Sequence, residues 1–389
     1  MSEIPKPITT PPSEAELAAR LDKVRALMAE QGLDYYVSHD PVNIYYLTNF
    51  ANYVHERPFI LVIPQDGTPM MLCPLLESTH VRARARAPLE YATYYEFPAP
   101  KGQMWFDVFR PLFKKGGRIG VEPTLPLFIA EKTPSAAFAV TDIIDEARLI
   151  KTDYEIGRTV HACQLINEGH EILLKIARPG ALELLIFSEV QKFLMEKLVA
   201  DIPDFNYYVT KVGAAVLPPS KSHDPHFVPT PFLAMEEGGP HVSGVGGQFD
   251  GYGVEVERAF FLGRAPEKAK RPFEVSMAAR ELAYELAKPG ANMNEIDEKV
   301  RKVIVDAGYG EHILHRTGHG LGITGHEAPY LALGYDRELE PGMLISIEPG
   351  IYIEGLGGFR HSDSVLITET GNVKLTQAPE RLEELVIET

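Results

Sequence analysis

The pattern of hydrophobic and polar positions near the N-terminus is that of an amphipathic helix. Four apolar residues recur at helical spacing, namely Leu17, Leu21, Val24 and Leu27. The Pro12-Ser13-Glu14 sequence can cap this helix at its start, and Gly32 can end it. The residues before it are rich in proline and polar side chains, so residues 1–14 are expected to form a flexible arm.

Short apolar runs separated by turns or helical stretches follow this helix. They are Tyr35–Val37, Phe59–Ile63, Met70–Cys73 and Ile119–Val121. Such runs predict the strands of a small mixed α/β domain. An alternation of Arg82, Arg84 and Arg86 predicts a charged edge strand. The composition becomes strongly helical near Arg148, so we expect one domain over residues 15–150 and a second over residues 151–389.

The second domain contains an internal repeat. The sequence ILLKIARPGALELLIFSEVQKFL surrounds Pro179-Gly180, and LAYELAKPGANMNEIDEKVRKVI surrounds Pro289-Gly290. Each predicts a helix, a Pro-Gly break and a second helix. Two such copies indicate a duplicated α/β unit, and related halves commonly leave a cleft between them.

A hairpin is predicted between these two copies. The stretch GGQFDGYGVEVERAFFLG runs from Gly246 to Gly263, and its Asp250-Gly251-Tyr252 sequence suits a tight turn. In the strand that follows, Glu255 and Glu257 should share one face because side chains alternate along a strand. Those two acids could line an active site or the solvated face of an edge strand.

Composition narrows the possible partners. The 389 residues are 45% hydrophobic and carry a formal net charge of -16. This charge argues against nucleic acid or an anionic membrane surface as a partner. Cys73 and Cys163 form no disulfide framework, and no apolar run approaches the length of a membrane span. We therefore expect a cytoplasmic protein that binds neither nucleic acid nor a membrane.

Four segments of the second domain are dense in His, Glu and Gly. They are SHDPHFVP with His226, the strand with Glu255 and Glu257, HRTGHGLGITGHEAP with His319 and His326, and SIEPGIYIEGLGGFRHSD with Glu348. Glycines flank His319 and precede His326, which lets the backbone approach another group closely.

In their order and spacing these segments resemble the pita-bread fold of creatinase, Xaa-Pro aminopeptidase, prolidase and methionine aminopeptidase. The resemblance covers essentially the whole chain and implies an α/β protein. It predicts a small N-terminal mixed α/β domain and a C-terminal pita-bread domain with an internal pseudo-twofold repeat. In the metallopeptidases of this family, two Asp, one His and two Glu bind two metal ions. Here His319 and Glu348 match, Glu255 replaces the second Asp, and Gly244 and Ser362 stand at the remaining two positions.

The pattern is more similar to creatinase, which works without metal. Glu257 and Glu348 match the glutamates that hold the guanidinium of its substrate, and His226 matches its general acid and base. Arg57 matches an arginine of the N-terminal domain that pairs with the substrate carboxylate. Tyr330 stands where creatinase has a second such arginine, which argues against creatine itself as the substrate.

These matches predict a metal-independent hydrolase without a cofactor. It would cleave a C–N bond in a small guanidino, amidine or amide compound that carries a carboxylate. Paired carboxylates can orient a nitrogen-rich group, and a histidine can move protons near neutral pH. The predicted catalytic residues are His226, Glu257, Glu348 and His326. The predicted substrate-binding residues are Arg57, Glu255, His319 and Tyr330.

Two alternatives stay open. One is an Xaa-Pro aminopeptidase or prolidase with a single divalent ion held by Glu255, His319 and Glu348, since three N/O ligands and water form a known catalytic pattern. The other is a non-catalytic module that binds peptides. The resemblance also implies a homodimer in which Arg57 of one subunit acts in the active site of the other.

Overall fold

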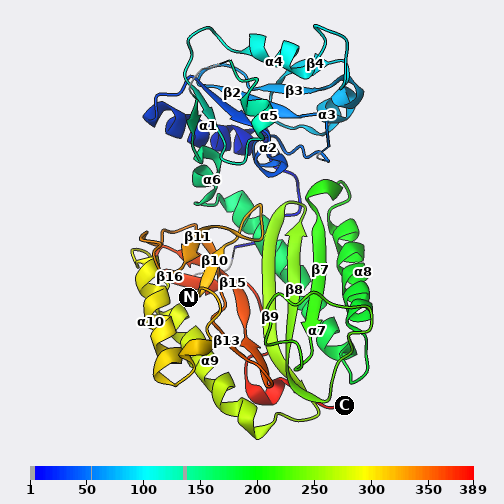
Figure 1. Ribbon diagram of the computed structural model, residues 1–389, viewed down its shortest axis with the longest axis vertical. Helices are drawn as coiled ribbons and strands as arrows, with labels where there is room; N and C mark the ends of the chain where they lie inside the picture. Colours follow the sequence, from blue (N-terminus) through cyan, green and yellow to red (C-terminus); the bar gives the residue numbers. More distant parts are fainter. Residues whose placement is uncertain (1–4, 54, 135–137) are drawn as a thin grey trace. The chain divides into compact units, whose positions relative to one another are not determined.

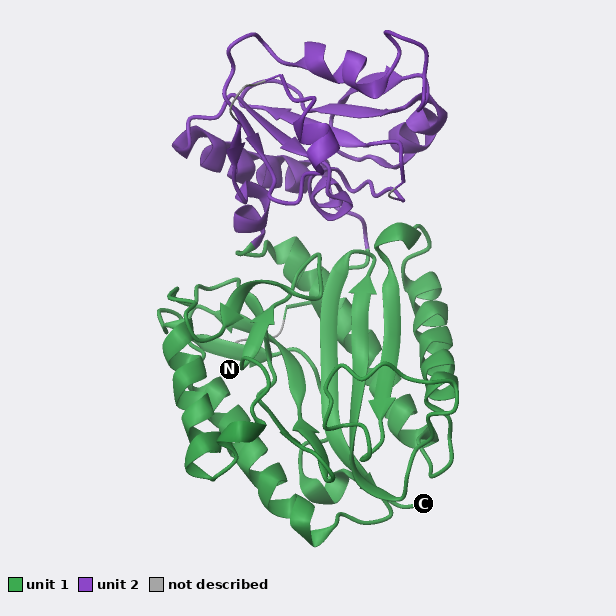
Figure 2. Ribbon diagram, in the orientation of Figure 1, with its two compact units in different colours: residues 1–9, 149–389 green, residues 10–148 purple. Residues whose placement is uncertain are grey.

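The structure, a computed structural model, describes residues 5–53, 55–134 and 138–389. The chain forms two compact units (Figure 2). One comprises residues 10–148, and the other comprises residues 149–389 together with the segment that ends at Thr9. This division lies two residues before the predicted boundary between residues 150 and 151.

The N-terminal unit is a mixed α/β layer around one sheet (Figure 1). Its elements are α1 (Glu14–Glu30), β1 (Tyr35–Ser38), α2 (Pro41–Thr48), β2 (Ile60–Pro64), β3 (Met70–Pro74), α3 (Ser78–Arg84), β4 (Glu90–Tyr94), α4 (Trp105–Phe109), β5 (Ile119–Val121), α5 (Leu127–Ala130), β6 (Ala139–Val140) and α6 (Ile143–Arg148). The sheet order is β4-β3-β2-β1-β5-β6. The four predicted apolar runs are thus strands β1, β2, β3 and β5, and α1 begins after its cap Ser13, whose hydroxyl accepts a hydrogen bond from Glu16 N.

Two local predictions for this part of the chain need correction. The arginine alternation is not an edge strand, because Arg82 and Arg84 lie in helix α3. The guanidinium of Arg82 lies over the ring of Tyr91 at 4.0 Å, which favours the helical placement. Three alternating residues are too few to distinguish a strand from the exposed side of a short helix.

The predicted flexible arm is not one uniform segment. Glu14 already begins α1, and the residues around Ile8 belong to the C-terminal unit. There, Ile8 N donates a hydrogen bond to Gly157 O over 3.0 Å. A Cβ on Gly157 would lie 2.6 Å from the Ile8 side chain, so the glycine makes room for this contact. Residues 1–4 lie outside the described part of the chain.

The C-terminal unit contains the larger sheet. Its elements are α7 (Asp153–Ile176), α8 (Glu183–Asp201), β7 (Lys211–Leu217), β8 (Gly238–Phe249), β9 (Tyr252–Leu262), α9 (Glu267–Leu286), α10 (Met293–Asp306), β10 (Gly318–Gly320), β11 (Glu327–Leu331), β12 (Leu344–Ile347), β13 (Gly350–Ile353), β14 (Gly357–Arg360), β15 (Ser362–Thr368), β16 (Gly371–Lys374) and β17 (Val386–Ile387). The main path of the sheet is β11-β10-β12-β15-β9-β8-β7. Helices α7 and α8 pack on the β7–β9 half, and α9 and α10 pack on the other half (Figure 1).

Backbone hydrogen bonds confirm the internal repeat. At the first Pro-Gly break, Gly180 N donates to Met235 O over 2.8 Å, and at the second, Gly290 N donates to Leu339 O over 2.8 Å. Both glycines have positive φ, 84° and 79°, a conformation that other residues adopt at a cost. In each half, therefore, the turn between the two helices is hydrogen-bonded to an extended segment that follows later in the chain.

The predicted hairpin is also present. Strands β8 and β9 pair antiparallel around a turn in which Asp250 has a φ of 47° and Gly251 a φ of 90°. Next to this turn, Gly253 N donates to Gly322 O, and a Cβ on Gly253 would lie 2.7 Å from Thr324 O. The glycine therefore lets the 322–325 loop lie directly against β9. None of the helices in the described chain combines the length and apolar character that crossing a membrane requires.

Candidate active site

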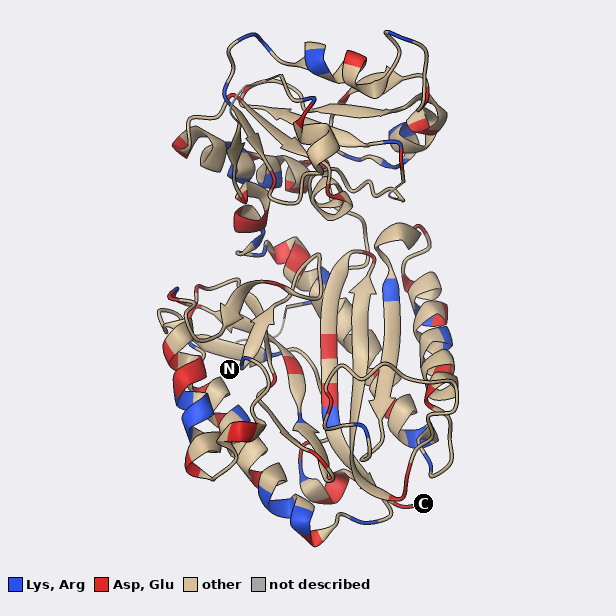
Figure 3. Ribbon diagram, viewed as in Figure 1, with Lys and Arg blue, Asp and Glu red and all other residues tan. Residues whose placement is uncertain are grey.

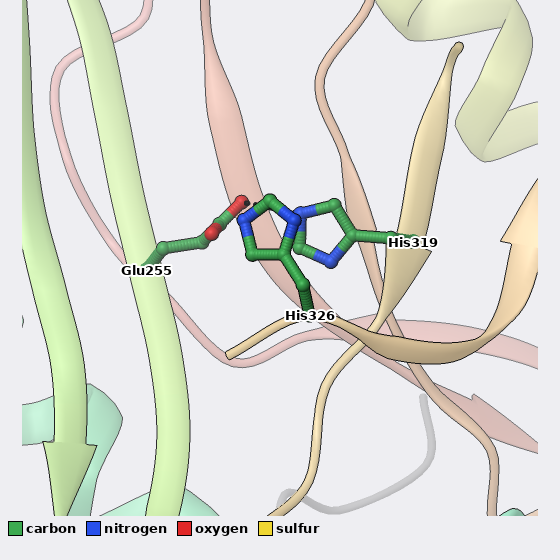
Figure 4. Close-up of side chains that lie close together, drawn as sticks. All are labelled: Glu255, His319 and His326. Carbon is green, nitrogen blue, oxygen red and sulfur yellow. Dashed lines mark ion pairs between the residues drawn. The ribbon is translucent and has the colours of Figure 1, made fainter. Parts of the chain in front are cut away.

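The predicted histidines and acids of the C-terminal unit meet where its two halves join. Glu255 and Glu257 lie on β9, which pairs with β15, and His319 lies on β10. Glu348 follows β12, and His326 precedes β11. The close approach of the 322–325 loop to β9 brings His326 toward Glu255 (Figure 4).

His319 is the centre of this cluster. Its Nδ1 lies 3.0 Å from Gly320 O, which leaves Nε2 directed at the acids. Nε2 lies 3.0 Å from Glu348 Oε1 and 3.6 Å from Glu255 Oε1. It is buried and makes no well-aligned hydrogen bond within the described chain. A buried nitrogen of this kind is a candidate ligand atom for a cation.

His326 completes a set of possible metal ligands. Its ring stacks on that of His319 with centroids 3.8 Å apart and planes 19° apart (Figure 4). Glu255, His319 and His326 each offer a donor atom, and these atoms lie within 4.8 Å of one another. Two imidazole nitrogens and a carboxylate are common ligands of divalent transition metals.

Burial and mutual charge displace the pKa values of this cluster. Burial and the nearby Glu348 raise the pKa of Glu255 to about 8. Burial lowers the pKa of His319, but its hydrogen-bonding contact with Glu348 and the charge of Glu255 outweigh it and raise the value to about 9. Burial likewise raises the pKa of Glu348, yet the adjacent His319 lowers it overall. Burial and the charge of His319 lower the pKa of His326 to about 4, which favours the neutral imidazole near pH 7.

Glu257 is already paired with a cation. Arg360 Nη2 donates to Glu257 Oε1 over 2.7 Å, and Arg360 Nε also contacts its second oxygen. Arg360 Nη1 further donates to the Tyr352 hydroxyl over 3.1 Å, and that hydroxyl lies 2.7 Å from His315 Nε2. Burial raises the pKa of Glu257, while Arg360 opposes the rise. The predicted role of Glu257 in holding a substrate's nitrogen group stays a prediction, and a ligand would have to compete with Arg360 for it.

Two hollows meet at His326. The first is a cavity of about 550 Å³. Its polar lining includes His226, Arg316, His319, His326, Glu348 and Arg360. The second, of about 660 Å³, is a groove along β7 and β8 lined by Gly244, Gly246, Glu255, Glu257 and His326, among others. The structure thus brings together His226, His319, His326 and Glu348 around the cavity, with Glu255 and Glu257 in the adjoining groove.

The remaining predicted substrate-binding residues, Tyr330 and Arg57, each contact other side chains of their own unit. Tyr330, on β11, supports the guanidinium of Arg316 at 4.6 Å from its ring centroid. Arg57 lies in the N-terminal unit, where it pairs with Glu56 over 2.7 Å and contacts Glu96. Its predicted action in a second subunit's site stays a prediction.

Sequence reasoning missed two features near the site. Arg316 lines the cavity, and its signal was a cation directly before the Thr-Gly-His-Gly sequence. Glu327 forms a buried ion pair with Lys151, with Lys151 Nζ 3.1 Å from Glu327 Oε1, and accepts a hydrogen bond from Thr324 N. This pair anchors the loop that carries His326, but no local pattern links Lys151 to it.

Comparisons with known proteins identify the family. The pattern of metallopeptidase family M24 matches residues 158–369, and that of the creatinase/prolidase N-terminal domain matches residues 20–150. The chain belongs to metallopeptidase family M24. Among its M24 relatives, the Xaa-Pro dipeptidase of Pyrococcus furiosus is 29% identical over 368 residues, which is 93% of this chain and 99% of the relative. The Xaa-Pro dipeptidase of Lactobacillus delbrueckii subsp. lactis is 29% identical over 379 residues, 94% of this chain and 99% of the relative.

A solved structure agrees with this assignment. The crystal structure of the prolidase from Pyrococcus horikoshii OT3 superimposes with a TM-score of 0.81 at 25% identity, covering 94% of this chain and 99% of that chain. The predicted pita-bread architecture, with an N-terminal mixed α/β domain, is therefore confirmed. Membership of family M24 also supports a hydrolase.

The predicted metal-independent, creatinase-like reaction was wrong. Relatives that match nearly the whole chain are named Xaa-Pro dipeptidases, and the family is one of metallopeptidases. The prediction relied on single matched positions, of which Glu257 is paired with Arg360. A resemblance over four residues carries less weight than one over the full length of the chain.

The residues present fit one metal ion better than two. Gly244 offers no side chain, and a Cβ there would lie 3.2 Å from Glu257 Oε1, so Glu257 occupies part of that space. Ser362 has a hydroxyl in place of a carboxylate and donates it to Glu255 Oε1 over 2.7 Å. A dinuclear centre needs bridging carboxylates to offset two close cations, and these are absent at both positions. The converging donors of Glu255, His319 and His326 fit a single ion.

Proposed function

We propose that the protein is a dipeptidase of the Xaa-Pro type that works with one divalent metal ion. The observation that carries this proposal is the convergence of three donor atoms, from Glu255, His319 and His326, within 4.8 Å. This set keeps Glu255 and His319 of the expected mononuclear site and replaces Glu348 with His326. Full-length similarity to Xaa-Pro dipeptidases supports the substrate class.

Each side chain has a distinct task in this scheme. The bound ion would supply Lewis-acid polarisation of the peptide carbonyl. His319 would hold the ion through Nε2, the atom that lies between the carboxylates of Glu255 and Glu348. Glu348 lines the cavity, so its carboxylate can accept a proton from the attacking water. His226, on the rim of the same cavity, can donate a proton to the leaving nitrogen.

Metal content measured together with hydrolysis tests this function. The protein would be purified without chelator or affinity-metal steps, and its metal content measured by plasma mass spectrometry. We expect about one ion per chain. Chelator treatment should abolish hydrolysis of an Xaa-Pro dipeptide such as Ala-Pro, and Mn²⁺, Co²⁺ or Zn²⁺ should restore it. His319→Ala should lower both the metal content and kcat/KM, the latter by at least about a hundredfold.

A matched variant controls for loss of a histidine as such. His312 lies near the exposed Glu311 and the ring of Tyr309, and it does not line the cavity. His312→Ala should therefore retain the ion and the activity. Metal-free wild-type protein that hydrolyses Ala-Pro at full rate would contradict the proposal. Protein that binds Ala-Pro without hydrolysing it, whatever the metal supplied, would instead favour the peptide-binding module.

A homodimer in the cytoplasm, with Arg57 acting in the partner's site, is a further part of this proposal. It is supported by the family resemblance at Arg57. Sedimentation at micromolar protein concentration should give about twice the mass of the 43.2 kDa chain. A monomer under these conditions would leave Arg57 without this role.

A further inference from the structure

The cavity contains an arginine whose positive charge has no acidic partner in the described chain. Arg301 and Arg360 also line the cavity, but Arg301 Nε lies 2.8 Å from Asp297 Oδ2 and Arg360 pairs with Glu257. The guanidinium of Arg316 lies over the ring of Tyr330, and its Nε is buried without a hydrogen-bond partner among the described residues. A buried N–H donor without a partner is unfavourable unless a ligand satisfies it, and Nε of the half-buried Arg316 is such a donor.

The backbone around Arg316 is held firmly in place. The next residue, Thr317, donates from its N and its hydroxyl to Asp297 Oδ1 over 2.9 and 2.7 Å. Thr317 N also lies 3.1 Å from Leu331 O, which ties the segment to β11. The Tyr330 ring, 4.6 Å from the Arg316 guanidinium carbon, supports the head of the side chain. Arg316 is therefore positioned before any ligand arrives, which lowers the entropy lost on binding.

The chemistry of the free guanidinium selects the ligand group. A guanidinium presents planar, paired N–H donors that match a carboxylate in a bidentate arrangement. The same cavity is lined by His319, His326 and Glu348, the groups assigned above to the reaction. A dipeptide has one carboxylate that every member of its class shares, namely its C-terminus.

We propose that Arg316 binds the C-terminal carboxylate of the substrate, and that this contact selects peptides with a free C-terminal acid close to the cleaved bond. The assignment rests on the proposed function for the identity of the substrate. Tyr330 acts as a positioning residue for Arg316. The predicted substrate-binding role of Tyr330 thus becomes an indirect one, exerted through the neighbouring arginine.

Binding of a carboxylic acid and its amide to metal-free, full-length protein tests this inference without catalysis. The probes are N-acetyl-L-proline and N-acetyl-L-prolinamide, which differ only at the C-terminal group, and calorimetry gives the Kd of each. Wild-type protein should bind the acid about tenfold to a hundredfold more tightly, the range expected for hydrogen bonds to a charged group. Arg316→Gln should remove this preference by weakening the acid alone.

Two further variants separate charge from geometry. Arg316→Lys keeps the charge but loses the paired donors, so it should show an intermediate preference for the acid. Arg271 is exposed on α9 and does not line the cavity, so Arg271→Gln removes one positive charge and should leave both Kd values unchanged. With Ala-Pro as substrate, Arg316→Gln should raise KM about tenfold or more and change kcat little.

The outcomes separate this inference from the proposed function. Equal binding of acid and amide by the wild type, or an unchanged preference in Arg316→Gln, would overturn the role of Arg316 even if Ala-Pro is hydrolysed. An Arg316-dependent preference supports the carboxylate site even if no peptide is hydrolysed. Thermal unfolding of each variant verifies that it is folded. If Arg316→Gln does not fold, Arg316→Lys decides the matter, because an acid preference equal to that of the wild type would overturn the bidentate contact.

Discussion

The two faces of the β9–β15 strand pair differ in how completely their charged side chains are paired with opposite charges. On one face, Arg258 and Asp363 are fully buried and lie 3.0 Å apart, Arg258 Nη2 to Asp363 Oδ1. On the other face, the Glu255 carboxylate accepts a hydrogen bond from the hydroxyl of Ser362 and lies 3.6 Å from His319 Nε2, Oε1 to Nε2. Residues adjacent in a strand point to opposite faces, so Arg258 and Asp363 lie behind the site while Glu257 and Ser362 lie within it. Figure 3 shows acidic and basic positions close together along β9.

The difference separates a structural charge cluster from a functional one. Asp363 accepts hydrogen bonds from Arg258, Arg280, Tyr284 and Thr376, so its charge is compensated. The site face holds several acids, and within the described chain their cations are Arg360 and a protonated His319. Incomplete compensation displaces pKa values and leaves the cluster ready to accept a cation. The same pair of strands thus provides rigidity on one face and binding on the other.

The largest change in the free energy of unfolding should come from replacing Asp363, on the face whose charges are paired. Asp363→Asn would leave Arg258 and Arg280 with the part-exposed Glu380 as their remaining acidic partner in the described chain. This loss should lower the free energy of unfolding by about 3 kcal/mol at pH 7. The two arginines hold the Asp363 pKa far below its ordinary value of 3.8, against the effect of burial. The stabilisation is therefore present above about pH 4 and is lost as the pH falls further. Urea unfolding at several pH values measures it.

An exposed aspartate provides the control for this prediction. Asp336 is exposed to solvent, whereas Asp363 is fully buried. Asp336→Asn should therefore change the free energy of unfolding by less than about 1 kcal/mol. An Asp363→Asn variant that is as stable as the wild type at pH 7 would show that the arginine cluster is compensated elsewhere.

A smaller change in stability, of opposite sign, is expected when Glu255 on the site face is replaced. Burial and Glu348 raise the pKa of Glu255 from 4.5 to about 8, so the folded, metal-free protein retains this proton longer than the unfolded chain does. Its stability should therefore fall between about pH 5 and pH 8. Glu255→Gln removes this loss and should stabilise the metal-free protein by about 2 kcal/mol above pH 8, since one pKa unit corresponds to about 1.4 kcal/mol and lost attraction to His319 offsets part of the gain.

Chelator-treated protein is required for that comparison, with thermal unfolding measured at pH 5 and pH 8.5. In the presence of metal the sign should reverse, because Glu255→Gln removes a proposed ligand. An identical pH dependence of wild type and variant in chelator would show that Glu255 is not the group that titrates.

The smallest effect should come from Ser362, which links the two faces. Its hydroxyl donates to Glu255 Oε1 over 2.7 Å and favours the ionised acid. Ser362→Ala should therefore raise the Glu255 pKa further, by less than about one unit, and move the alkaline loss of stability to higher pH. Ser362→Thr retains a hydroxyl and serves as the matched control. A midpoint displaced toward lower pH in Ser362→Ala would contradict this account.

Much of the fold could be predicted from local pattern. Helix α1 after Ser13, the paired helices around Gly180 and Gly290, and the hairpin at Gly251 follow from spacing, capping and positive-φ glycines, which act within a few residues. The arginine alternation failed because three residues carry too little periodicity to exclude helix α3. Spacing in the GHG segment also identified His319 as a site residue, and the structure places it at the centre of the cluster.

What the sequence by itself determined is therefore the two-domain α/β organisation, the shared face of Glu255 and Glu257, and the residue types available to the site. Only the tertiary structure decided how those charges are paired. Glu257 meets Arg360 from a separate strand, and His326 joins Glu255 and His319. Arg316 pairs with no acid in the part of the chain that the structure describes. The physical reason is that backbone conformation depends on near neighbours, whereas the energy of a charge depends on distances of a few ångströms between segments far apart in the chain.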